Sequence, residues 1–419
     1  MRVKTFTIPL QTSIILFITT ILLLFPTHHQ AKNNLPISAT DAAAILPPLQ
    51  DLLLFADQRL AAIYPVIQRF KNTITSDPFN VTATWTGSNI CRYKGFFCDT
   101  PPDNRSATTV ASIDFNGFHL SSPTLVGFLD ELPDLALFHA NSNYFSGAFP
   151  SSIAALPYLY ELDLSNNRLS GPFPTAILAM DGLSFLDIRS VPDQGCYSLK
   201  QQHPWSAVPP ELFAMDLDLL FLNNNNFMTR LPDNADADAH VAYLNLANNK
   251  FFGPIPRSIA KALSGLSEIL LLNNLLSGCL PYELGLLKDA VVFDAGGNDL
   301  TGPLPFSLGC LEKLEVLNLA GNKLYGQVPE PLCLLGNLRN VSLSGNYFMG
   351  AAPACMRLIA AGVMDVRGNC IPGQPLQRPV ADCAAFMARP KYCPYSDTYS
   401  KIPCWIPQFG PSIRGVAKR

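Results

Sequence analysis

Apolar residues recur along most of this chain in one short pattern. Residues 159–174 read Leu-Tyr-Glu-Leu-Asp-Leu-Ser-Asn-Asn-Arg-Leu-Ser-Gly-Pro-Phe-Pro, and the same pattern returns at 266–281 and 314–329. The alternation of apolar and polar residues at its start predicts a short strand with one inward apolar face. The Gly-x-x-Pro at its end predicts a turn. Each unit is therefore a strand, a turn and a return segment, too small to bury a core by itself.

Eleven such units follow one another, with steps of 25, 24, 24, 34, 24, 25, 24, 24, 24 and 23 residues between their ninth positions. A near-constant period of 24 predicts an α/β-type solenoid of leucine-rich repeats. The Gly-x-x-Pro turns resemble those of plant-specific leucine-rich repeats, and this resemblance implies a right-handed superhelix. An asparagine amide at the ninth position can satisfy backbone groups in the turn. The ninth positions are Phe118, Asn143, Asn167, Val191, Asn225, Asn249, Asn274, Asn298, Asn322, Asn346 and Asn369.

The segments around the repeats predict the domain organisation. Residues 1–31 combine a basic start with a short apolar run and are expected to be a cleaved signal peptide. Residues 41–108 form an N-terminal cap, with a helix expected over 42–71 that Pro65 kinks or breaks. The repeats occupy 109–369, a Cys-rich cap 370–404 and a tail 405–419. No later apolar run is long enough to span a membrane, so the mature chain is expected to be extracellular.

The chain has 11 cysteines, all after residue 90, which indicates an oxidising compartment. Cys91 and Cys98 are expected to form a staple over the first unit. The connectivity of the others cannot be read from the sequence. Cys196 is the expected odd thiol and lies in an irregular insertion, 190–205, which is either a functional loop or a coding-sequence error. The other expected disulfide cysteines are Cys279, Cys310, Cys333, Cys355, Cys370, Cys383, Cys393 and Cys404.

Composition and motifs exclude several classes of protein. The formal net charge of −3 is too balanced for a non-specific nucleic-acid binder, and 48% hydrophobic residues argue against global disorder. No nucleophile elbow, phosphate-binding loop or metal-ligand spacing occurs. We therefore expect a protein without catalytic activity, cofactor or metal.

The third and fifth positions of the units predict a concave binding face. It is acidic toward the first units and aromatic or apolar in the middle, which favours a basic or amphipathic peptide. Phe221 and Tyr243 are expected to form one anchor pocket, and the acidic positions are expected to be solvent-exposed. The candidate ligand-binding residues are His139, Glu161, Asp163, Asp187, Phe221, Tyr243, Asn245, Glu268 and Asp294.

Three Asn-x-Ser/Thr sequons, at Asn80, Asn104 and Asn340, are expected N-glycosylation sites in a secreted chain. Asn340 is the third position of its unit. A glycan there would limit ligand binding at the C-terminal end of the face.

Both caps resemble those of the plant leucine-rich repeat extensins. The resemblance rests on residues 76–85, Cys91-Arg-Tyr-Lys-Gly-Phe-Phe-Cys98, Leu135–Asn143 and the Cys-rich segment 369–393. The 15 residues after Cys404 carry no Ser-Pro run, so the resemblance does not extend to an extensin tail. The Gly-x-x-Pro turns are more distantly similar to polygalacturonase-inhibiting proteins.

The resemblance implies a secreted, non-enzymatic binding protein of the plant cell wall or apoplast. It implies a basic secreted peptide of the rapid-alkalinization type as the partner, or a wall protein. A homodimer is a further possibility. The alternatives left open are an inhibitor of a wall-degrading hydrolase and a structural wall component.

Overall fold

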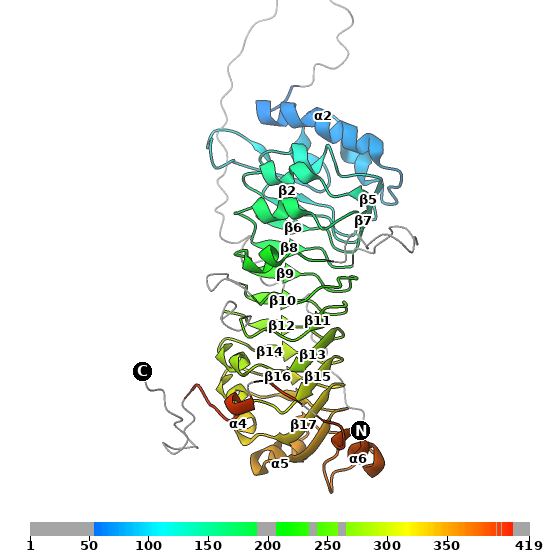
Figure 1. Ribbon diagram of the computed structural model, residues 1–419. Helices are drawn as coiled ribbons and strands as arrows, with labels where there is room; N and C mark the ends of the chain where they lie inside the picture. Colours follow the sequence, from blue (N-terminus) through cyan, green and yellow to red (C-terminus); the bar gives the residue numbers. More distant parts are fainter. Residues whose placement is uncertain are drawn as a thin grey trace, which may run out of the picture. The chain divides into compact units, whose positions relative to one another are not determined.

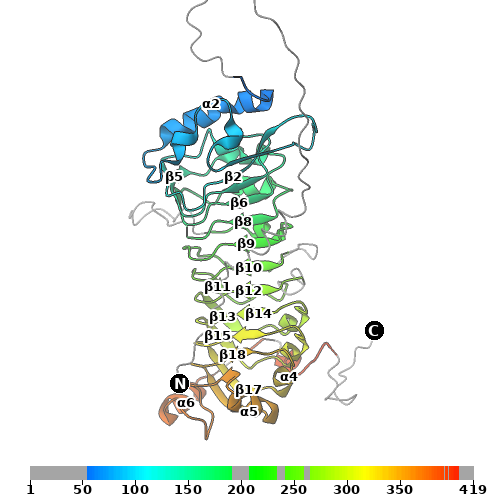
Figure 2. The same ribbon diagram turned by 180° about the vertical axis from the view of Figure 1, so that it is seen from behind.

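The computed structural model describes residues 54–190, 207–233, 241–258, 265–390, 392–394 and 396–404. Each of the eleven units contributes one parallel strand to a single long sheet, and the strands follow one another in sequence order (Figures 1 and 2). The antiparallel strand β1 (Phe96–Asp99) is added at its N-terminal edge. The parallel strands are β2 (Thr109–Asp114), β4 (Leu137–His139), β6 (Glu161–Asp163), β8 (Phe185–Asp187), β9 (Leu219–Phe221), β10 (Tyr243–Asn245), β12 (Glu268–Leu270), β14 (Val292–Asp294), β16 (Val316–Asn318), β18 (Asn340–Ser342) and β20 (Met364–Asp365).

The apolar residues of the pattern form the core, as the alternation predicted. The fourth-position residue of each strand lies opposite that of the next, as in Phe138, Leu162 and Leu186. All three side chains are fully buried. Because each unit covers the apolar edge of its neighbour, the core runs through the whole stack.

The ninth-position asparagines tie consecutive units together. Asn322 donates through Nδ2 to the carbonyls of Leu319 in its own unit and Ala295 in the preceding one, at 3.1 and 2.9 Å. Its Oδ1 accepts from the backbone N–H of Leu300 at 3.0 Å. The asparagines at these positions from Asn143 to Asn369 repeat this use of the amide, so the backbone-satisfying role expected of them is confirmed.

The residue before each ninth position has a left-handed backbone conformation. Its φ lies between 51° and 70° in every unit, a conformation that glycine, asparagine and serine tolerate better than β-branched residues do. The repeated preference for these three residue types was therefore a signal in the sequence. The residues are Gly117, Ser142, Asn166, Ser190, Asn224, Asn248, Asn273, Gly297, Gly321, Gly345 and Gly368.

We call the stacked ninth-position asparagines the asparagine ladder. A second row of strands follows it in the chain. One three-stranded sheet contains β3 (Ser121–Ser122), β5 (Tyr144–Ala148) and β7 (Arg168–Ser170). A five-stranded sheet contains β11 (Phe252–Gly253), β13 (Leu275–Cys279), β15 (Asp299–Gly302), β17 (Lys323–Val328) and β19 (Tyr347–Ala351). The return segments carry η3 (Leu129–Glu131), η4 (Ser151–Ala155), η5 (Thr175–Ala179), η6 (Pro210–Ala214), η7 (Tyr282–Leu286), η8 (Phe306–Cys310), α4 (Glu330–Cys333) and α5 (Pro353–Ala360).

Helix α2 (Gln58–Thr73) covers the first unit, together with η1 (Val81–Thr84) and η2 (Ile90–Arg92). It begins where the Asp57 carboxylate accepts from the backbone N–H of Arg59 at 2.8 Å. The expectation that Pro65 breaks the helix is wrong, because α2 continues to Thr73. Pro65 is on the exposed side of the helix, while Phe70 is buried and stacks on Phe128 with ring centroids 3.8 Å apart.

Five disulfides join the ten cysteines of the described residues. Cys91 bonds to Cys98, the staple that the spacing suggested. The sequence had left the other pairings open. They are Cys279–Cys393, Cys310–Cys404, Cys333–Cys355 and Cys370–Cys383. The chain after α6 (Val380–Met387), which includes η9 (Ser396–Thr398), therefore runs back along earlier units.

Several expectations fall outside the described residues. They are the signal peptide 1–31, the helix N-terminal to residue 54, the segment 191–206 with Cys196, and the tail 405–419.

Candidate ligand-binding face

The candidate residues lie on one side of the long sheet. We call the third- and fifth-position side chains of β2 to β20 the strand face. The parallel register sets third positions beside third positions and fifth beside fifth, as in Tyr243 opposite Glu268 and Asn245 opposite Leu270. The candidates that the sequence singled out are therefore neighbours on consecutive strands from β4 to β14.

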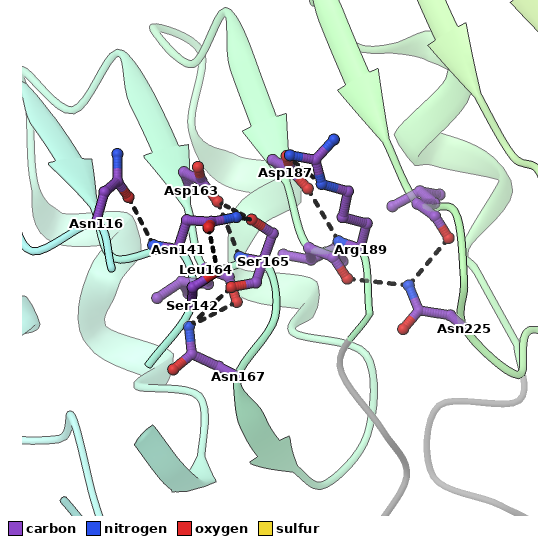
Figure 3. A network of polar contacts seen from close by, with 12 residues as sticks. Asn116, Asn141, Ser142, Asp163, Leu164, Ser165, Asn167, Asp187, Arg189 and Asn225 are labelled. Carbon is purple, nitrogen blue, oxygen red and sulfur yellow. Dashed lines mark hydrogen bonds and ion pairs between the residues drawn. The ribbon is translucent and has the colours of Figure 1, made fainter. Parts of the chain in front are cut away.

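Polar contacts connect the first part of this face. His139 Nε2 is 2.8 Å from Glu161 Oε2, across neighbouring strands. Asp163 Oδ1 accepts from the backbone N–H and the hydroxyl of Ser165, and that hydroxyl also contacts Asn141. Figure 3 shows the contacts among Asn141, Asp163 and Ser165, with the Asp187–Arg189 pair beside them. The carboxylates here are thus already hydrogen-bonded or paired within the protein.

Asp187, Phe221 and Asn245 are buried, with relative exposures of only 1%, 4% and 6%. The expectation that the acidic positions are solvent-exposed is therefore wrong at Asp187. Asp187 Oδ2 lies 3.2 Å from Arg189 Nε, and the Arg189 guanidinium is 5.9 Å from the centre of the Phe221 ring. Alternation along a strand predicts which face a side chain is on, but not which neighbours cover it.

Burial shifts the protonation equilibria of this cluster. Burial, reinforced by the nearby Asp163 charge, raises the pKa of Asp187 well above its ordinary value, despite Arg189. Burial also raises the pKa of Asp163. Burial alone would lower the pKa of His139, but the hydrogen bond to Glu161 and the surrounding carboxylates outweigh it, so that pKa is raised.

The second part of the face, on β10, β12 and β14, is more open. Tyr243, Glu268 and Asp294 are all half-buried. Burial raises the pKa of Glu268 and of Asp294, although Asp294 accepts from the Gly296 N–H and from Asn318 Nδ2. Within the described chain, neither carboxylate forms an ion pair. No third or fifth position from β9 to β18 is Lys or Arg. Among the residues that the structure describes, these two carboxylates therefore have no cation of their own.

The fifth-position Asp and Asn residues have a structural role that sequence reasoning missed. In seven units the side-chain oxygen accepts from the backbone N–H two residues later, at 2.9 to 3.1 Å. Such Asx turns satisfy the backbone where the strand ends. The recurrence of Asp or Asn at this position could have revealed them. The residues are Asp114, Asp163, Asp187, Asn245, Asp294, Asn318 and Asp365.

The three sequon asparagines are exposed. Asn104 Oδ1 accepts from the N–H and hydroxyl of Ser106, the third residue of its own sequon. Asn340 begins β18 on the strand face. Glycan attachment at Asn80, Asn104 and Asn340 stays a prediction.

Two kinds of feature are absent from the residues that the structure describes. No three His, Cys, Asp or Glu side chains there are grouped so that they could hold a metal ion. None of the helices in the same ranges has the length and apolar character needed to cross a bilayer.

The stacked strands, the buried asparagine ladder and the disulfides define a leucine-rich repeat protein. The Leucine Rich Repeat family matches residues 158–180, 240–262 and 313–335. The chain is 47% identical over 361 residues to leucine-rich repeat extensin-like protein 6 of Arabidopsis thaliana, covering 85% of this chain and 72% of that protein. It belongs to the plant leucine-rich repeat extensin-like family. With extensin-like protein 4 of Arabidopsis thaliana it shares 44% identity over 221 residues, 52% of this chain and 41% of the relative.

Solved structures share the fold. The plant peptide hormone receptor RGFR1, in complex with RGF2, has a TM-score of 0.50 and 25% identity, over 61% of this chain and 41% of the receptor. A TDR receptor has a TM-score of 0.51 and 27% identity, over 59% and 41%. A plant ice-binding protein has a TM-score of 0.58 at 21% identity, over 76% of this chain and 97% of its own, which shows the fold alone.

Proposed function

We propose that this protein is a secreted, non-enzymatic binding protein of the plant cell wall that captures a basic peptide on its strand face. The observation that carries the proposal is the pair of half-buried carboxylates on β12 and β14, Glu268 and Asp294, beside Tyr243. A carboxylate that is partly desolvated and lacks a cation gains more from an incoming Lys or Arg than a fully solvated one does. The similarity to RGFR1, a plant peptide hormone receptor, supports a peptide as the partner class.

Secretion and the wall location rest on the family and on the five disulfides, which need an oxidising compartment. Rapid-alkalinization-type peptides, as secreted basic peptides, fit the charge of the face. Aromatic and carboxylate side chains presented together suit a partner of this kind.

We propose Tyr243 alone, in place of a Phe221–Tyr243 pair, as the aromatic anchor of the ligand. Phe221 is buried at 4% exposure and packs against Phe185, with ring centroids 6.0 Å apart. Its replacement by Ala would create a core cavity costing about 3 kcal/mol, so a binding defect in that variant would be ambiguous. Tyr243 is half-buried and serves as the accessible aromatic contact.

The test is a titration of rapid-alkalinization-type peptides against wild type and a Glu268→Gln/Asp294→Asn variant at two salt concentrations. We expect about tenfold weaker binding, and a smaller salt dependence, in the variant. The charge-matched control is Asp299→Asn/Glu312→Gln, since both residues are exposed and lie outside the strand face. Equal affinities for all three proteins would contradict the proposal. Inhibition of a wall hydrolase in place of peptide binding would support the inhibitor alternative.

A further inference from the structure

On β12 and β14 the strand face combines two acidic and two aliphatic side chains, which we call the β12–β14 patch. The parallel register sets Glu268 of β12 opposite Val292 of β14, and Leu270 of β12 opposite Asp294 of β14. The two carboxylates therefore occupy one diagonal of the patch, and the two aliphatic side chains occupy the other. All four residues are half-buried.

The two carboxylates of the patch differ in what they already bind. Asp294 Oδ1 accepts from the Gly296 N–H at 2.9 Å, and Asp294 Oδ2 accepts from Asn318 Nδ2 at 3.0 Å. Within the described ranges, Glu268 forms no side-chain hydrogen bond and no ion pair. Both oxygens of Glu268 thus lack a donor from those ranges, whereas each oxygen of Asp294 already accepts one bond.

This difference favours an arginine as the partner of Glu268. A guanidinium can donate to both oxygens of a carboxylate and can stack on an aromatic ring, and an ammonium cannot make the same paired contact. Tyr243 stands opposite Glu268 on the neighbouring strand β10 and is half-buried. Its ring is therefore within reach of a guanidinium bound at Glu268. Asp294 has fewer acceptor sites left, so a single ammonium suits it as well.

The spacing of the carboxylates indicates how a ligand presents its cations. Alternate residues of a strand are about 6.6 Å apart and neighbouring strands about 4.8 Å, so the Cα atoms of Glu268 and Asp294 are about 8 Å apart. In an extended peptide, alternate side chains point to the same side and adjacent ones to opposite sides. Only the alternate spacing directs two basic side chains at this diagonal together. Their aliphatic stems would then lie on Leu270 and Val292.

We propose that the ligand presents an arginine to Glu268 and a second basic residue, two positions away in an extended segment, to Asp294. The inference rests on the proposed function, capture of a basic peptide on the strand face. It adds a sequence requirement, Arg-x-Lys or Arg-x-Arg in either direction, that net positive charge alone does not impose.

Synthetic peptides of one composition test the spacing. One isomer has Arg and Lys separated by a single Ser, a second has them adjacent, and a third places them four residues apart, as on one face of a helix. Calorimetric titration against the full chain measures each affinity. We expect the first isomer to bind about tenfold more tightly than the adjacent one, which loses one of two charged contacts. Equal affinities, no binding by any isomer, or tightest binding by the third would overturn the proposal.

The arginine requirement is tested with a version of the first isomer in which Lys replaces Arg. Wild type should bind this version several-fold more weakly, and Glu268→Gln should bind both versions equally. Glu312→Gln is the matched control, because Glu312 is exposed outside the strand face, and it should keep the preference for Arg. Both variants should keep the wild-type melting temperature. A preference for Arg that persists in Glu268→Gln would overturn the assignment of the arginine to this residue.

A rapid-alkalinization-type peptide, titrated beside the isomers, separates failure of this inference from failure of the proposed function. If that peptide binds wild type and loses affinity in Glu268→Gln/Asp294→Asn while the isomers bind equally, capture on the strand face stands and the spacing is overturned. If neither that peptide nor any isomer binds wild type, both proposals are overturned.

Discussion

The two ends of the solenoid are closed by different means. At the N-terminal end, α2 buries five apolar side chains, and a cluster that includes Phe70, Trp85, Phe115 and Phe128 fills the space beneath it. At the C-terminal end, α6 buries none of its residues, and disulfides with sequence separations of 13, 22, 94 and 114 hold the chain. The open side of a terminal repeat can thus be covered by a packed apolar cluster or by chain segments that disulfides hold in place.

The two ends of the strand face also differ, in the environment of their carboxylates. Its N-terminal part contains the half-buried Asp163 and the buried Asp187, and the pKa of each is raised by burial. Its C-terminal end contains Asp365, whose pKa is lowered by the Arg367 side chain beside it. The two ends should therefore respond in opposite directions to pH.

The largest effect expected is at the aromatic core of the N-terminal cap. Phe70→Ala should cost about 3–5 kcal/mol in the free energy of unfolding, because it removes a fully buried ring. Phe386→Ala at the other end should cost far less, since Phe386 is half-buried and stacks on Tyr347. Denaturant unfolding of both variants measures the difference. Similar costs would mean that the C-terminal cap also depends on a packed core.

Removing a long-range disulfide tests how the C-terminal end of the solenoid is closed. Cys279→Ser/Cys393→Ser opens a loop of 114 residues and should cost about 2–4 kcal/mol, confined to the last units. Cys91→Ser/Cys98→Ser opens a loop of 7 residues and should cost less. Hydrogen exchange read by mass spectrometry locates the loss. Faster exchange in α2 of the first variant would contradict this local account.

The pH response is expected to be smaller. The pKa of Asp187 and of His139 is raised in the folded state, so both hold a proton more tightly than in the unfolded chain. Stability of the N-terminal units should fall as pH rises above about 4 for Asp187 and about 6.5 for His139. Asp365 has a lowered pKa, so its contribution should be lost as pH falls below about 4.

Hydrogen exchange at several pH values, read separately for the units around β8 and around β20, measures this opposition. Asp187→Asn should flatten the acidic part of the first profile and leave the second unchanged. If protection from exchange changed with pH in the same direction at both ends, the opposite pKa shifts assigned to Asp187 and Asp365 would be refuted.

The sequence predicted what depends on local periodicity. The inward apolar positions and the asparagine ladder repeat every 24 residues, so Asn322 could be assigned its role from the pattern around it. The pairing of Cys279 with Cys393 could not, because nothing local specifies the path of the chain after α6. The burial of Asp187 was missed for a similar reason, since strand alternation identifies a face without its covering neighbours. The break expected at Pro65 failed because the ring is on the exposed side of α2.

Site-specific photo-crosslinking tests the central claim most directly. A photoreactive phenylalanine in place of Leu270 would stand at the fifth position between Asn245 and Asp294, on the strand face. The same group in place of Thr301 would stand on β15, in the five-stranded sheet outside the strand face. The account predicts that a rapid-alkalinization-type peptide crosslinks to position 270 and not to position 301. Crosslinking at 301 alone would contradict capture on the strand face.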